Sequence, residues 1–408
     1  MTAAPREGEQ AVGQVPPMLG FWLTLLLAVG GGIVVANLYY AQPLLAPISE
    51  ALGIAPWAAG IAMTVTQVGY GIGLLLVVPL GDRFENRRLI VATLLVVAGS
   101  LLAAGLAANA PLFLAACFSI GVSASVAQIL VPYASHLAAP ADRGRVVGNV
   151  MSGVLLGMML ARPVASLMAD AHGWRAVFLG SCAVVTVLAL VMALVVPRRT
   201  PSDGFRYRTL FRSLRALLVD HPALRRRAAI QFCLFGAFTL FWTVIPLLLA
   251  SSAFGMTQKG IAIFALLGVT GAGAAPLVGW ASDRGWGRLG ALAGILASVV
   301  AFALCLMAGA GHSGLVLLVV AGILLDCGVA CSLVVGQRTI LTLGSEGRSR
   351  VNGLFFSIFY SGGAIGSAVG AWAMVVGGWT LAMGIGLAVV LVAFALHVTE
   401  RTSGASAH

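Results

Sequence analysis

Charged side chains are scarce in this sequence. They make up 9% of its 408 residues, against roughly a quarter in an ordinary soluble domain. Hydrophobic residues make up 60%, and the mean hydropathy is +1.01. A domain in water needs a polar surface, so most of the surface of this chain must face lipid instead. The shortage of charge excludes a large soluble domain, and the hydrophobicity excludes a disordered chain.

Several kinds of functional motif are also missing. The six cysteines fall inside apolar runs, at spacings that match neither a metal site nor a disulfide framework. No glycine-rich phosphate-binding loop occurs, the only lysine is Lys259, and no serine, histidine and acid are placed as a nucleophile set. We therefore expect no enzymatic activity, no bound metal and no cofactor.

The sequence instead contains twelve apolar runs, each about as long as a helix that spans the hydrocarbon core of a membrane, which needs ~20 residues. The runs lie near residues 18–43, 55–80, 89–109, 111–138, 146–170, 174–197, 228–251, 258–281, 289–310, 313–342, 351–375 and 378–398. The pattern predicts an all-α membrane protein with twelve transmembrane helices.

The basic residues predict the orientation of these helices. Twenty of the 24 lie before the first run, after the last, or in every second connection between runs. The other connections contain Arg175 and Lys259. Positive residues accumulate on the cytoplasmic side, so we expect both termini to be cytoplasmic. The net charge of +11 therefore does not indicate a nucleic-acid partner. The linker 198–227 contains nine arginines and an amphipathic segment, which we expect to contact membrane lipids or to act as a simple tether.

An internal repeat divides the chain into two halves. A short charged motif follows the second run and recurs after the eighth, 201 residues later. The first copy is Asp82, Arg83 and Arg87, and the second is Asp283, Arg284 and Arg288. Such repeats are typical of transporters. We expect two pseudo-symmetric six-helix bundles, residues 1–197 and 228–408, joined by the linker 198–227.

These motifs resemble those of the major facilitator superfamily, and more narrowly its twelve-helix drug:proton antiporter branch. The second charged motif begins at Gly279 and fits the family pattern G-x-x-x-D-R-x-G-R-R/K, whereas the first has Val78 and Glu85 where glycine is usual. The resemblance implies that both motifs form a cytoplasmic gate, whose contacts are weak enough to break in every transport cycle.

The fifth run resembles the helix-packing pattern of the same branch. The small positions of the pattern are occupied by Gly148, Gly157, Ala161, Ala165 and Ser166. Arg162 stands where the family has proline. The segment Asn37–Leu44 is similar to one found in a subset of bacterial inner-membrane exporters. The small residues favour close contact between helices.

The resemblance implies a monomeric transporter in the bacterial inner membrane that is powered by the proton gradient. Its partners would be protons, membrane lipids and a small organic compound or drug, which it exports by alternating access. Import or facilitated diffusion of a metabolite such as a sugar or an organic acid is the first alternative. A receptor or membrane enzyme without transport activity is a second and more remote alternative.

Two charged residues stand clearly inside the predicted spans, Arg162 and Asp326. Charges in a membrane usually face a cavity or a partner. Burial favours the neutral form of an acid and a nearby cation favours its carboxylate, so an acid between these influences is suited to carry a proton. We expect Asp326 to be the proton carrier and Arg162 to tune the proton or substrate site. A purely structural pairing of the two is the alternative.

Uncharged polar residues inside the runs are candidates for a substrate cavity. They are Tyr39, Tyr40, Gln42, Gln67, Gln128 and Gln231. The amides could equally form hydrogen bonds between helices, and the tyrosines could anchor the protein at the membrane interface.

Overall fold

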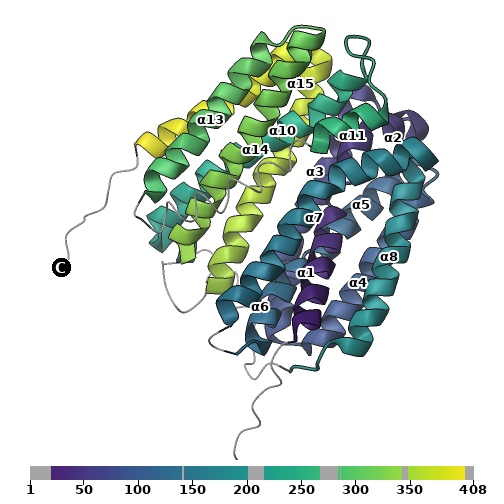
Figure 1. The fold of residues 1–408 in the computed structure, drawn as a ribbon, viewed down its shortest axis with the longest axis vertical. Coiled ribbons are helices and arrows are strands. Elements are labelled where there is room, and N and C mark those ends of the chain that lie inside the picture. Colours follow the sequence, from purple (N-terminus) through teal and green to yellow (C-terminus); the bar gives the residue numbers. More distant parts are fainter. Residues whose placement is uncertain are drawn as a thin grey trace, which may run out of the picture.

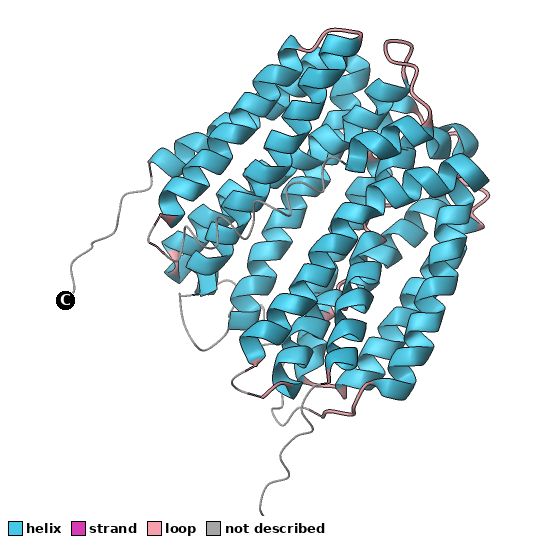
Figure 2. Cartoon of the chain, viewed as in Figure 1, coloured by secondary structure: helices cyan, strands magenta, loops and turns pink. Residues whose placement is uncertain are grey.

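The computed structural model describes residues 20–139, 142–200, 216–266, 284, 286–341 and 348–399. Within these ranges the chain folds into helices and connecting turns, with no strand (Figure 2). The first part comprises α1 (Phe21–Ala36), α2 (Leu45–Leu52), α3 (Ile61–Leu76), α4 (Asn86–Gly105), α5 (Ala110–Ala124), α6 (Ala127–Leu137), α7 (Arg143–His172) and α8 (Trp174–Val195). The second comprises α10 (Pro222–Ala250), α11 (Gln258–Leu266), α13 (Gly287–Met307), α14 (His312–Leu341) and α15 (Arg348–Val398).

Nine helical stretches of the described chain are long and apolar enough to cross a membrane. The first expected run is divided, because α1 ends at Ala36 and a turn leads into a short 3₁₀ helix, η1 (Gln42–Leu44). Pro43 has no backbone N–H to continue an α-helix there. The run expected near 258–281 is described only as far as Leu266.

The last two expected runs are both contained in α15. A straight helix of its 51 residues would be about 75 Å long, well beyond the roughly 30 Å of a membrane core. The helix is interrupted at Gly377 and Gly378, where Gly378 has φ 65° and ψ −161°, a conformation that other residues rarely adopt. This kink separates two segments, each long enough for one span.

Helices of the first and second parts gather on different sides of the molecule. In Figure 1, α1 and α4 to α8 lie toward the lower right, and α13 to α15 lie toward the upper left. We call the end at which α1, α4, α7 and α10 begin the arginine-rich end, and the other the arginine-poor end. The two parts contact each other where α3 packs along α15, where α7 meets α11, and where η1 meets α10.

Polar contacts join α3 to α15. The Thr64 hydroxyl lies 2.8 Å from that of Ser367 and donates a hydrogen bond to the backbone oxygen of Ala364 at 3.0 Å. Nearer the arginine-rich end, the Ser357 hydroxyl donates to the backbone oxygen of Gly71 at 3.1 Å. At the arginine-poor end, the backbone N–H of Lys259 donates to Asp170 of α7 at 3.3 Å. These hydrogen bonds hold the two parts together over much of their contact surface, which we call the seam.

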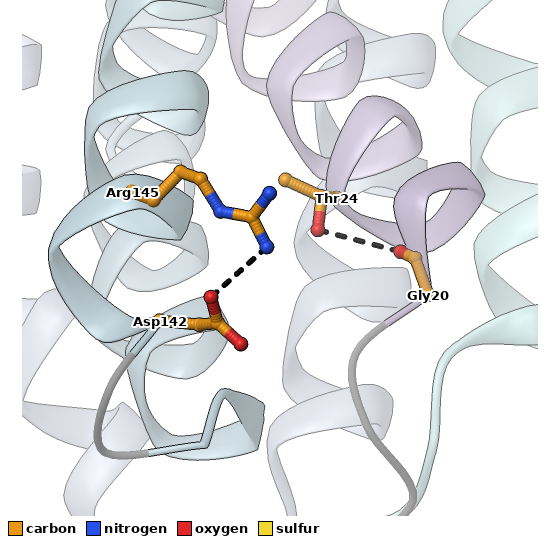
Figure 3. Close-up of polar contacts among 4 residues, drawn as sticks. All are labelled: Gly20, Thr24, Asp142 and Arg145. Carbon is orange, nitrogen blue, oxygen red and sulfur yellow. Dashed lines mark hydrogen bonds and ion pairs between the residues drawn. The ribbon is translucent and has the colours of Figure 1, made fainter.

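The ends of α1 and α7 are neighbours at the arginine-rich end (Figure 3). An ion pair of 3.0 Å joins Arg145 to Asp142, and the Thr24 hydroxyl bonds to the backbone oxygen of Gly20 at 3.4 Å. The ion pair is exposed, so it contributes about 1 kcal/mol at most.

Glycines allow α1 and α7 to approach closely. A Cβ atom added to Gly157 would lie 2.2 Å from the backbone oxygen of Gly32 on α1, and one added to Gly153 would lie 2.3 Å from that of Ala28. Gly148, on the same helix, would meet nothing within 4 Å. Of the predicted packing positions, Gly157 therefore contacts the neighbouring backbone and Gly148 faces open space, while the other three are buried. Those three are Ala161, Ala165 and Ser166.

We expect Gly157→Ala to lower the thermal unfolding temperature by several degrees, because its methyl group would force α1 and α7 apart at a cost of about 1–3 kcal/mol. Gly148→Ala is the matched control and should leave the unfolding temperature near that of the wild type. Unfolding in detergent micelles would measure both. Equal unfolding temperatures for the two variants would contradict the contact.

Candidate functional site

The two charged residues predicted inside the spans are buried and lie on different parts of the molecule. Arg162 is on α7 and 4% exposed, and Asp326 is on α14 and 6% exposed. A buried charge costs several kcal/mol unless other groups compensate it. The surroundings of these two side chains therefore decide what the site can do.

Trp242 of α10 stands between the two charges. The guanidinium carbon of Arg162 lies 4.3 Å from the centroid of the indole ring. The indole N–H donates a hydrogen bond to Oδ1 of Asp326 at 3.3 Å. Arg162 and Asp326 thus form no direct ion pair, and the indole links them. A cation on an aromatic face contributes about 2 kcal/mol when water is excluded.

Further groups surround the guanidinium of Arg162. Its carbon lies 5.2 Å from the ring centroid of Phe238 on α10 and 5.5 Å from that of Tyr39, which follows α1. Nε of Arg162 donates a hydrogen bond to Oε1 of Gln42 at 2.8 Å. The cation is therefore enclosed by aromatic rings from both parts of the molecule and oriented by one amide.

Four polar atoms of this cluster are buried without a hydrogen-bond partner among the described residues. They are Nη2 of Arg162, Nε2 of Gln42, the hydroxyl oxygen of Tyr39 and Oδ2 of Asp326. Buried polar atoms are nearly always paired, so such atoms require an explanation. A void of about 10 Å³ adjoins Arg162 and Trp242 and is lined further by Pro43, Ile261 and Phe264. It has room for about one water molecule, so this conformation encloses the site without space for an organic molecule.

The structure brings two of the predicted cavity residues, Tyr39 and Gln42, to Arg162. Gln67 is buried on α3 at the seam, where a Cβ on Gly363 of α15 would contact its Oε1. Tyr40 is partly buried and contributes to none of the contacts described above.

The other two amides bridge helices within one part of the molecule. Nε2 of Gln128 donates to the hydroxyl of Tyr70 at 3.2 Å, which joins α6 to α3. Nε2 of Gln231 donates to the hydroxyl of Ser332 at 2.9 Å, which joins α10 to α14. Such hydrogen bonds between helices are the alternative role that we considered for these amides.

Sequence analysis did not single out Trp242, Phe238 or Tyr360. Trp242 lies in the middle of an apolar run, whereas tryptophan prefers the ends of membrane helices, and this position is the signal that could have identified it. The ring of Tyr360 on α15 lies 4.4 Å from that of Tyr70 on α3, and 5.2 Å from that of Phe235 on α10. These rings extend the aromatic wall across the seam.

Much of the predicted gate lies outside what the structure describes. Asp283 falls in an undescribed range, and the side chain of Asp82 is likewise not described. Arg83, Arg284 and Arg288 are exposed and Arg87 is partly buried. The segment after α3 is nevertheless fixed to the segment after α8, because the backbone N–H of Asn86 donates to the backbone oxygen of Arg199 at 2.9 Å.

Comparison with known proteins supports one family. The model described as Major Facilitator Superfamily matches residues 27–340. The chain is 35% identical to the uncharacterized transporter YgaY of Escherichia coli O157:H7, over 88% of this chain and 90% of that relative. It is 27% identical to the inner membrane transport protein YnfM of Escherichia coli K12, over 65% of this chain and 64% of that protein.

Solved structures share the fold at low sequence identity. A variant of the nucleoside transporter NupG superimposes with a TM-score of 0.77 at 15% identity, over 93% of this chain and 99% of that chain. The D-xylose-proton symporter superimposes with a TM-score of 0.68 at 14% identity, over 92% and 97%.

Proposed function

Because this chain belongs to the Major Facilitator Superfamily, we propose that it is a proton-coupled carrier that moves a small organic compound by alternating access. That it is a multi-pass membrane transporter and not an enzyme follows from the family itself. The observation that carries the proposal is the buried carboxylate of Asp326, linked through Trp242 to Arg162 on the other part of the molecule. Ionisable residues inside a membrane commonly mark proton or substrate pathways.

The proposed carrier has twelve spans in two six-helix halves, residues 1–197 and 228–408, with the basic linker 198–227 between them. The internal repeat, the kink in α15 and the contacts of α3 with α15 support this division. We place the arginine-rich end and both termini in the cytoplasm of a bacterium, because arginine is retained on that side of the inner membrane. The carrier would act as a monomer, with no cofactor besides the proton gradient.

In the proposed mechanism, Asp326 takes up a proton in one state of the carrier and releases it in the other. The indole of Trp242 holds the carboxylate in place, while Arg162 belongs to the opposite half. When the halves rock, the guanidinium leaves the indole face and the charge next to Asp326 changes. Protonation of Asp326 is thereby linked to the side on which the site is open.

For the direction of transport, the first candidate is export in exchange for protons, which the helix-packing pattern of α7 in the antiporter branch supports. One observation favours the second candidate, import together with protons. Arg162 occupies the proline position of that pattern, and its unpaired Nη2 would attract an anion, with which a proton could travel.

Flux measurements in proteoliposomes test the proposed function. A pH-sensitive dye would be enclosed, and a panel of organic acids, sugars and cationic drugs would be added outside. We expect at least one compound to change the internal pH. Acidification during uptake indicates cotransport, and alkalinisation indicates exchange. If transport of every compound that moves left the internal pH unchanged, proton coupling would be refuted.

We expect Asp82→Asn and Asp283→Asn each to slow transport about fivefold, which corresponds to an interaction of about 1 kcal/mol. The effect should be larger for Asp82, since the gate of the first half is the usual one in the family. Folded yield should change little. Asp220→Asn, an exposed acid outside both motifs, is the control. Turnover of both motif variants at the wild-type rate, at matched expression, would refute the gate.

A further inference from the structure

Two neighbouring hydrogen-bond donors in the site have no acceptor. Nη2 of Arg162 and Nε2 of Gln42 are both buried and unpaired among the described residues. They are held next to each other, because Nε of Arg162 donates to Oε1 of the same Gln42 amide at 2.8 Å. Both residues belong to the first part of the chain, so they would move together when the halves rock.

We propose that these two donors bind the carboxylate of an organic acid, which is the substrate of the carrier. A carboxylate offers two acceptor oxygens with several lone pairs and pairs strongly with guanidinium N–H groups. A cation would be repelled by Arg162. A neutral sugar would match two donors but would not balance the buried positive charge.

The side chains that line the site indicate the chemistry of the part of the substrate attached to the carboxylate. The rings of Tyr39, Phe238 and Trp242 surround the guanidinium, and the adjoining void is lined by Ile261 and Phe264. Such walls accept an aliphatic or aromatic body and offer few partners to a polyol. Since the void holds about one water molecule, the acid binds only when the halves separate and Trp242 moves from the guanidinium.

The charges of the site link the acid to a proton. When Asp326 is ionised, its unpaired Oδ2 would repel the substrate carboxylate. When Asp326 is protonated, the site carries the net positive charge of Arg162, which attracts the carboxylate. The other titratable groups that face this region are the thiol of Cys327 on α14 and the hydroxyls of Tyr39 and Tyr360. Helices α10, α13 and α15, which pack against α14, contain no acidic residue, and their arginines lie near the arginine-rich end. The anion and the proton therefore bind together.

This inference rests on the proposed proton-coupled function. It favours the second candidate, import together with protons, over export in exchange for protons. In this proposal Gln42 orients the bound carboxylate, and Arg162 supplies the positive charge that attracts it. Arg162→Lys keeps the charge but loses the planar fork, so we expect it to bind the acid more weakly than the wild type and more strongly than Arg162→Gln.

The test is direct binding to the purified full-length protein in lipid nanodiscs. The probes are acetate, hexanoate, benzoate and phenylacetate, with benzamide and benzylamine as the neutral and cationic counterparts of benzoate. Calorimetry at acidic and alkaline pH would report affinity. We expect at least one carboxylate to bind, more tightly at acidic pH, and at least tenfold more tightly than the amide or the amine.

Variants assign that binding to the site. Arg162→Gln should weaken carboxylate binding at least tenfold and Gln42→Leu should weaken it less, while Arg175→Gln, an exposed arginine on α8, should not change it. Each variant would first be shown to be folded by its thermal unfolding. Binding of none of the four acids, preference for benzylamine, or equal binding to Arg162→Gln would overturn the proposal.

Failure of this inference is separable from failure of the proposed function. If carboxylates do not bind but another compound moves with protons, the carrier function stands and the substrate class is wrong. If carboxylates bind at Arg162 but their transport leaves the internal pH unchanged, the site stands and proton coupling is wrong.

Discussion

Asp326→Asn is expected to abolish proton-driven accumulation of solute. Exchange of solute across the membrane should stay within about threefold of the wild type, a change of less than 1 kcal/mol in the barrier. Asparagine has the shape of aspartate and its Oδ1 can accept the indole N–H of Trp242, so the contact observed at 3.3 Å is retained. It cannot take up or release a proton. The variant therefore separates movement of the halves from proton coupling.

The measurement compares uptake driven by a pH gradient with exchange of labelled solute at equal pH on both sides. Glu50→Gln, an exposed acid on α2, is the matched control and should behave as the wild type. Proton-driven accumulation by Asp326→Asn at the wild-type level would exclude Asp326 as the carrier of the proton. Loss of both activities in a folded variant would mean that the carboxylate serves the movement of the halves instead.

The double variant of Arg162 and Asp326 is expected to be less impaired than the sum of the two single variants. Each single change leaves one charge buried without its counterpart, at a cost of about 3–5 kcal/mol. Arg162→Ala leaves the carboxylate, and Asp326→Asn leaves the guanidinium. Removing both removes the cost, so the loss of thermal stability should be non-additive. Unfolding temperatures of the four proteins in one detergent provide this comparison.

Trp242→Phe tests whether the indole N–H of Trp242 transmits the interaction between Arg162 and Asp326. Phenylalanine keeps an aromatic face for Arg162 but has no N–H for Asp326, so the non-additivity measured in its background should be smaller. Additive effects of Arg162→Ala and Asp326→Asn in the wild-type background would show that the two side chains do not interact. In that case Asp326 could still carry the proton, with another partner.

The sequence predicted the features that depend on the residues of a single helix, such as its position in the chain and the charges inside it. The apolar runs located the described helices other than α2, which lies between the first two runs. The interval between the runs ending at 375 and beginning at 378 anticipated the kink at Gly377 and Gly378. Arg162 and Asp326 were identified because a charge is rare in an apolar run. The early end of α1 at Ala36 was not anticipated, since the predicted run continued to residue 43, through a turn whose residues are mostly buried.

The contacts between helices could not be predicted from the same information. Helical periodicity gives the face on which Trp242 lies, but it does not tell which residues of α7 and α14 meet that face. The indole link between Arg162 and Asp326 is therefore a tertiary feature. The glutamines show the same limit, because Gln42 binds Arg162 whereas Gln128 and Gln231 bridge neighbouring helices.

Infrared difference spectroscopy of the reconstituted protein tests most directly whether Asp326 takes up and releases the proton. A protonated carboxyl group has a C=O stretch that a carboxylate lacks, and a buried one absorbs apart from exposed acids. We predict such a C=O band in the wild type, and we expect the band to grow on acidification. It should be lost in Asp326→Asn and retained in Glu50→Gln. A spectrum that Asp326→Asn leaves unchanged across the pH range would contradict the account.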